Sequence, residues 1–119
     1  MCAISLVACG AREPAPFAFP PAIGVWKLKL VKEVIAPPEQ ILRLGLKRSQ
    51  SADYEGPGRI VAEIYEMTSS AGAFEAEQKW RPSADTVAFH QENRFTVIHW
   101  ESADRDSVSA FVRAIQKLV

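Results

Sequence analysis

Residues 86–119 read TVAFHQENRFTVIHWESADRDSVSAFVRAIQKLV and hold the clearest structural signals in the chain. Two β-branched and aromatic runs, 86–90 and 94–100, flank a short polar turn, a pattern typical of a β-hairpin. Asp104 follows at a position suited to cap a helix that runs to the last residue. The apolar residues of this helix recur at the spacing of one buried face: Val108, Phe111, Val112, Ile115 and Leu118. A hairpin followed by an amphipathic helix predicts that the helix covers a sheet.

Earlier segments of the chain alternate between strand and helix signals. They are a strand at 25–32, a helix at 37–45, an edge strand at 46–55, a strand at 59–67 and a helix at 71–80. In the first strand Trp26, Leu28 and Leu30 fall on one face, because successive side chains of a strand point to opposite sides. We expect the C-terminal helix to pack on the face that includes Leu28 and Leu30.

The resulting element order is β-α-β-β-α-β-β-α. It predicts an α+β fold, a two-layer sandwich with an antiparallel-rich sheet and helices on one face. The first six elements match a ferredoxin-like unit to which a strand and a helix are added. We expect residues 22–119 to form a single domain of this kind.

Composition excludes several classes of protein. The 119 residues carry 14 basic and 14 acidic side chains and have zero formal net charge, so no chain-wide positive field favours nucleic acid. No apolar run approaches the ~20 residues of a membrane-spanning helix. With 2 cysteines, both in the first ten residues, a disulfide-stapled scaffold is also excluded. We expect a soluble domain that uses no cofactor.

Cysteine Cys9 lies in a distinctive setting near the start of the chain. The segment 6–9 reads LVAC and follows further apolar residues, and the next stretch, 10–21, is rich in proline. The LVAC segment resembles the lipobox of bacterial lipoproteins. That resemblance implies cleavage before Cys9, lipid on its sulfur, and anchorage of the chain to a membrane by buried acyl chains. The alternative is a short apolar N-terminal strand with two buried thiols.

The resemblance divides the chain into three parts. Residues 1–9 would be a signal remnant with the lipidation site, residues 10–21 a proline-rich tether, and residues 22–119 the domain. The chain would lie in the bacterial cell envelope, facing the periplasm or the surface. Three features of the domain also resemble an uncharacterised family of small bacterial envelope domains: GVWKL at 24–28, Ala73-Phe74 and WRP at 80–82. That family implies no catalytic or metal site.

Histidine supplies the few candidates for chemistry. If the hairpin turn is centred on Glu92-Asn93, His90 opposes Phe95 and Thr86 opposes His99. The two imidazoles then lie about 13 Å apart, too far to share one metal ion. Thr86 with His99 is the best pairing of a nucleophile with a base that the chain offers, although cross-strand threonine contacts commonly stabilise sheets. We therefore expect no metal site and assign no catalytic residue.

Three functional hypotheses follow. The first is a lipid-anchored binding domain whose partner is another envelope protein or a small ligand. The second is a small enzyme whose carboxylates and His99 are brought together by the fold. The third is a structural accessory subunit of a membrane complex. A concave site with clustered titratable groups would favour the enzyme, and an open face with exposed rings would favour binding.

Overall fold

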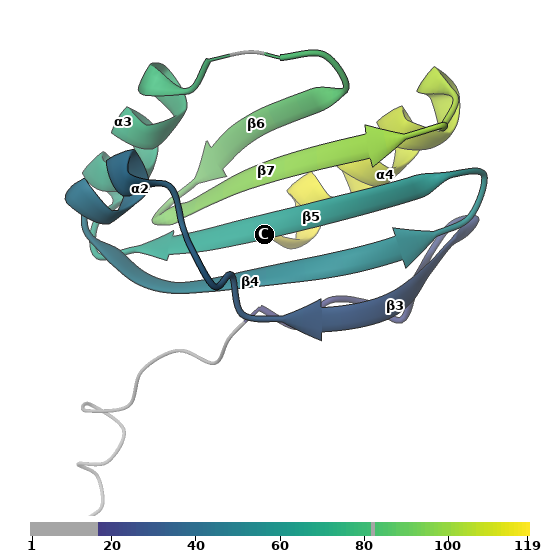
Figure 1. Ribbon diagram of the computed structural model, residues 1–119, viewed down its shortest axis with the longest axis horizontal. Coiled ribbons are helices and arrows are strands. Elements are labelled where there is room, and N and C mark those ends of the chain that lie inside the picture. The colour runs from purple at the N-terminus through teal and green to yellow at the C-terminus, as the bar shows by residue number, and fades with distance from the viewer. Residues whose placement is uncertain (1–16, 82) are drawn as a thin grey trace, which may run out of the picture.

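The computed structural model describes residues 17–81 and 83–119. Its strands form an antiparallel six-stranded sheet in the order β2-β3-β4-β5-β7-β6 (Figure 1). The strands are β2 (Ala22–Ile23), β3 (Trp26–Lys32), β4 (Leu46–Glu55), β5 (Arg59–Met67), β6 (Thr86–Gln91) and β7 (Arg94–Glu101). The helices of the described residues are α2 (Glu39–Arg43), α3 (Ser70–Lys79) and α4 (Arg105–Leu118). None of these helices is long and apolar enough to cross a membrane.

The sheet curls into a half-barrel and carries helices on both of its faces (Figure 1). Helix α4 covers one face, which we call the α4 face, and helices α2 and α3 pack at one end of the other, the α3 face. The predicted two-layer sandwich with helices on one face is therefore wrong. The ferredoxin-like variant is wrong as well, because β3 and β4, which flank α2, are direct antiparallel neighbours. In a ferredoxin-like unit the strands on either side of the first helix are parallel and are separated by another strand.

Strand β5 shows why both faces are covered. Ile60, Ala62 and Ile64 point to the α4 face, whereas Tyr65 and Met67 belong to the cluster under α2 and α3. A strand with apolar side chains on both sides gains stability only if both sides are buried, so one layer of helices cannot complete the core.

The core of the α4 face centres on Phe111. Its ring contacts Tyr54 edge-on, with 4.9 Å between ring centroids, and Trp26 at 6.2 Å. The indole nitrogen of Trp26 donates a hydrogen bond to the carbonyl of Ser107 in α4 at 3.1 Å. Val108 and Ile115 lie in the same cluster, so these three positions of the predicted apolar face of α4 are confirmed as core.

Two residues expected in that core lie outside it. The register of β3 with β4 shifts between Leu28 and Leu30, so Leu28 pairs with Tyr54 but Leu30 pairs with Asp53. A bulge of this kind reverses the alternation of side chains. Leu30 consequently faces the α3 side and is 51% exposed. Leu118, at the end of α4, is equally exposed, so the expectation for both residues is wrong.

Strand β4 lies in the interior of the sheet, between β3 and β5, and not at the predicted edge. Its polar character has a local cause. Ser49, Ser51 and Asp53 point to the α3 face, of which α2 and α3 cover one end. The opposite side of the strand carries Ala52 and Tyr54, both fully buried. The strand therefore alternates because its two sides meet different surroundings.

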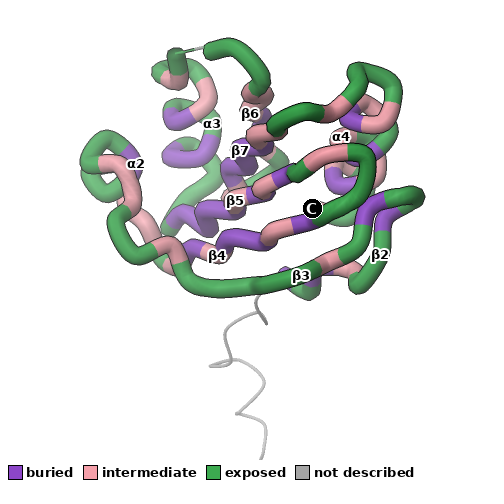
Figure 2. The backbone as a smooth tube through the Cα atoms, turned by 45° about the vertical axis from the view of Figure 1, so that its right-hand side comes forward, coloured by how far each residue is buried: buried purple, intermediate pink, exposed green. Residues whose placement is uncertain are grey.

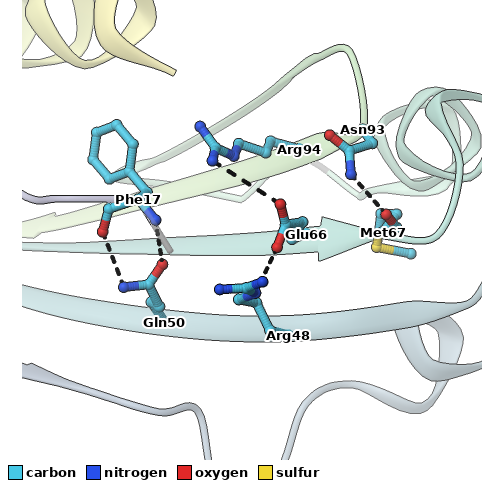
Figure 3. A network of polar contacts seen from close by, with 7 residues as sticks. All are labelled: Phe17, Arg48, Gln50, Glu66, Met67, Asn93 and Arg94. Carbon is cyan, nitrogen blue, oxygen red and sulfur yellow. Dashed lines mark hydrogen bonds and ion pairs between the residues drawn. The ribbon is translucent and has the colours of Figure 1, made fainter. Parts of the chain in front are cut away.

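The first described residues, 17–21, pack against the sheet. The backbone N–H of Phe17 donates a hydrogen bond to the side-chain oxygen of Gln50 at 3.0 Å. The side-chain nitrogen of Gln50 in turn donates to the carbonyl of Phe17 at 3.1 Å (Figure 3). Tyr54 donates its hydroxyl to the carbonyl of Pro20 at 2.7 Å. Phe17 and Phe19 are buried, so this end of the predicted tether contributes to the core.

Glu66 is the buried carboxylate of the α4 face. Arg48 Nε lies 2.6 Å from one carboxylate oxygen and Arg94 Nη2 lies 4.0 Å from the other (Figure 3). The Arg48 contact is outside hydrogen-bond alignment, so its attraction is mainly Coulombic. Two cations around one carboxylate offset the cost of removing it from water. The guanidinium of Arg94 also lies 5.7 Å from the centroid of the Phe17 ring.

Candidate functional site

The predicted lipidation site, Cys9, lies outside the described residues. Among the hollows of the described part of the chain, two have polar side chains of particular interest. One is the α3 face beyond helices α2 and α3, and the other is a groove between α4 and the β6–β7 edge of the sheet.

The α3 face holds the histidine pair that the sequence singled out. The predicted hairpin register is confirmed, since Thr86 pairs with His99 and His90 with Phe95. Both imidazoles lie on this face. His90 contacts Glu77 of α3 and packs edge-on against the ring of Phe74, so it fastens β6 to that helix.

His99 forms the centre of a polar line across three strands. Its Nδ1 lies 3.3 Å from the hydroxyl oxygen of Thr86, and its Nε2 lies 3.2 Å from Oε1 of Glu63. Tyr65 donates its hydroxyl to the same Glu63 oxygen at 3.2 Å. Burial, and then the adjacent Glu63 carboxylate, raises the pKa of the Tyr65 hydroxyl. Sequence reasoning missed Glu63 because it lies diagonally across the sheet from His99.

A threonine, a histidine and a carboxylate in contact resemble the parts of a nucleophilic site, in which one ring nitrogen of the base faces the hydroxyl and the other faces the carboxylate. The two ring nitrogens of His99 have these two partners. The Thr86 hydroxyl also donates to the carbonyl of Ala84 at 3.2 Å, so this carbonyl competes with His99 for the hydroxyl proton. The same contacts tie β5, β7 and β6 together, and cross-strand contacts of this kind commonly stabilise sheets.

A shallow hollow of about 270 Å³ borders this line. Its walls come from β3, β4, β5 and the segment after β3: Lys32, Val34, Ile35, Ser51, Asp53, Arg59, Val61 and Glu63. Arg59 and Asp53 neutralise each other at 3.2 Å. Among the residues that the structure describes, no group of three or more histidine, cysteine, aspartate or glutamate side chains could hold a metal ion.

The groove between α4 and the β6–β7 edge is larger, about 620 Å³. Five apolar residues line it: Val87, Trp100, Ala103, Val108 and Val112. Arg105, Ser109 and Arg113 form its helical wall, each four residues after the last, so they lie in one row on α4. A second hollow of about 500 Å³ shares Arg113 and continues along α4 past Gln116 and Lys117.

The charge of this groove is uncompensated within the described chain. Arg105 and Arg113 form no ion pair there, although most other arginines of the sheet and helices do. Asp85 lines the same groove and is likewise unpaired with either arginine. Two cations, one anion and an apolar floor give a site that is complementary to an anion with an apolar body.

Helical periodicity places the three residues of the helical wall in one row, but it does not predict a groove beside them. Arg105, Ser109 and Arg113 flank the apolar stripe of the C-terminal helix, at positions where solvated side chains are also common. Glu63 and Glu66, three residues apart in β5, lie on opposite faces of the sheet, and neither lines the groove. Asp104 caps α4 by accepting the amide of Ser107 at 3.0 Å.

Comparison with protein-family models, with curated proteins and with solved structures finds no match for this chain.

Proposed function

We propose that this chain is a binding domain that takes an anionic ligand with an apolar body into the groove between α4 and the β6–β7 edge. The observation that carries the proposal is the pair of unpaired arginines, Arg105 and Arg113, on the wall of an apolar groove of about 620 Å³. The ligand would place a carboxylate or phosphate between the guanidinium groups and its apolar part against Val87 and Trp100.

The α4 groove supports binding better than catalysis. No histidine lines this groove, so none is placed there to activate the hydroxyl of Ser109. Guanidinium groups recognise planar oxyanions through paired hydrogen bonds and remain charged at every physiological pH. Such a wall is suited to holding an anionic ligand.

Calorimetric titration with dodecanoate, dodecyl phosphate, dodecanol and dodecylamine tests the proposal. We expect the two anions to bind, the neutral alcohol to bind more weakly, and the amine to bind least. Arg105→Gln and Arg113→Gln should each weaken anion binding about threefold, which is about 0.6 kcal/mol for a solvent-exposed ion pair. Arg81→Gln is the matched control, because Arg81 is exposed and lines neither hollow on α4.

Equal affinity for the alcohol, the amine and the anions would contradict this function. So would arginine substitutions at 105 and 113 that change binding no more than Arg81→Gln. Tryptophan fluorescence is a second readout, since the indole of Trp100 lines the groove and its emission should respond to the ligand. Trp100→Phe should remove that response.

The proposal includes the membrane anchor that the LVAC segment at 6–9 implies. Lipid on Cys9 would hold the domain on a bacterial envelope membrane, facing the periplasm or the surface, where its ligand could be a small molecule or part of another envelope protein. Mass spectrometry of the membrane fraction, from a bacterium expressing the gene in its natural context, should detect a mature chain that begins with acylated Cys9. Cys9→Ala should abolish the modification and Cys2→Ala should not. A soluble, unmodified chain would contradict the anchor.

A further inference from the structure

Besides the α4 groove, the outer edge of β3 is a surface on which a partner could bind. Strand β2 covers only its beginning, where Ala22 pairs with Lys27 and Ile23 with Trp26. Within residues 17–81 and 83–119, no strand pairs with the outer edge of segment 30–32 (Figure 1). An unpaired edge presents free backbone donors and acceptors to any extended chain that can align with it.

Exposed apolar side chains lie on both sides of this edge. Leu30 is 51% exposed on the α3 face, and Val31 is 42% exposed on the α4 face because it pairs with Ala52. Ile35, which follows the strand and borders the 270 Å³ hollow, is 90% exposed. The whole strand after Leu28 is exposed along its length (Figure 2). Apolar side chains concentrated along an open strand mark a contact surface.

The charge of the edge is positive. Lys27, Lys29 and Lys32 lie along β3, and of these only Lys29 has a carboxylate partner among the described residues, Glu55 at 3.6 Å. Glu33 follows the strand, and the three lysines together still outnumber Glu33 and Glu55, so the edge has a net positive charge. We propose that an extended segment of another protein, in which acidic and apolar residues alternate, adds to β3 as a further strand.

Two other occupants fit the edge less well. A second copy of this chain, paired antiparallel about the centre of β3, would set Lys29 of one copy opposite Lys29 of the other, which is destabilising. It would also need the outer edge of Trp26 and Lys27, which β2 already occupies. A membrane surface can contact only one side of the sheet, whereas Leu30 and Val31 point to opposite sides. An added strand contacts both sides and supplies partners for the backbone edge, as in other cases of strand addition.

The probe is a fluorescein-labelled, end-capped nonapeptide in which glutamate and valine alternate, titrated with the full chain and followed by anisotropy. We expect saturable binding of this peptide and none of its counterpart with lysine in place of glutamate. In a strand, alternate amides point to the same edge, so N-methylation of all valines blocks one edge of the peptide and N-methylation of all glutamates blocks the other. At least one methylated peptide should bind tenfold more weakly or not at all.

Leu30→Gln and Leu42→Gln form a matched pair, because both leucines are 51% exposed and Leu42 lies on α2, away from the edge. The first should weaken peptide binding at least tenfold and the second should leave it unchanged. The double variant Lys27→Glu with Lys32→Glu should reject the glutamate peptide and accept the lysine peptide. Circular dichroism and thermal unfolding establish that each variant is folded.

Several results would overturn the proposal. One is a glutamate peptide that does not bind, or whose two methylated forms bind as tightly as the parent. Another is a concentration-dependent dimer in sedimentation velocity that Leu30→Gln abolishes, which would assign the edge to a second copy. A third is binding to phosphatidylglycerol–phosphatidylcholine vesicles without any binding of the peptide, which would assign it to a membrane.

Discussion

Phe111 is fully buried and contacts both Tyr54 and Trp26, so it joins α4 to two strands. Replacement of Phe111 by alanine should lower the free energy of unfolding by about 3–5 kcal/mol, because it removes a large buried side chain and leaves a cavity. Urea unfolding measures the change. Phe74→Ala is the control, since Phe74 is half exposed, and it should cost below about 1 kcal/mol. A similarly small cost at Phe111 would mean that α4 is peripheral.

Glu66 offers a test of the buried ion pairs. Glu66→Ala would remove the carboxylate that Arg48 and Arg94 share, and we expect a loss of about 3 kcal/mol in unfolding free energy. Glu66→Gln keeps the shape and an acceptor oxygen and should lose less. Glu55→Ala, which breaks only the exposed pair with Lys29, should change stability by about 0–1 kcal/mol. Equal effects of Glu66→Ala and Glu55→Ala would refute a special role for the buried carboxylate.

At the scale of elements, the N-cap of helix α4, Asp104, should make stability depend on pH. Hydrogen bonds from Ser107 hold the pKa of Asp104 below its usual value. The unfolded state therefore binds this proton more readily, so the cap's contribution is present above the ordinary aspartate pKa and is lost as pH falls through the lower folded value. The difference in unfolding midpoint between the natural chain and Asp104→Asn should shrink as the solution is acidified. A constant difference would contradict this account.

The same scale shows what periodicity could and could not predict. Strand β5 and helix α4 were predictable, because their apolar residues recur at the period of the element. The sequence also indicated a second covered face, since apolar and polar residues alternate little in 59–67 and such strands are usually buried on both sides. The bulge at Leu28/Leu30 was not predictable. A strand of alternating lysine and leucine gives no local sign that one residue is out of register.

At the scale of the whole molecule, the two buried tyrosines limit stability at high pH. Burial raises the pKa of Tyr54 to about 12, and burial with Glu63 raises that of Tyr65. Unfolded tyrosines lose their protons near pH 10, so above that pH the unfolded state binds fewer protons than the folded state. The free energy of unfolding should therefore fall as pH rises beyond about 10.

Urea midpoints between pH 8 and 11 measure this loss, and Tyr54→Phe should reduce its slope. Phenylalanine keeps the ring but cannot ionise, and it gives up the hydrogen bond to Pro20 at every pH alike. An unchanged slope in that variant would show that other groups control alkaline unfolding.

The groove is a property of the whole molecule and of no single segment. Asp85 comes from the loop before β6, Trp100 from the end of β7, and Arg105 and Arg113 from α4. Each segment alone has an ordinary pattern, so the sequence predicts the helix and the hairpin but not the hollow between them. The Thr86–His99 pairing was predictable because a short hairpin turn determines its own register.

The hydrogen bond between Trp26 and Ser107 joins residues separated by 81 positions. During synthesis the ribosome releases Trp26 well before α4, the helix that buries it, because α4 follows all six strands in the chain. Strands β3, β4 and β5 can pair as soon as they are made, but their apolar side remains open until residues beyond Phe111 have been added. A nascent chain therefore keeps this apolar side accessible to chaperones or to a translocation channel until α4 has been made.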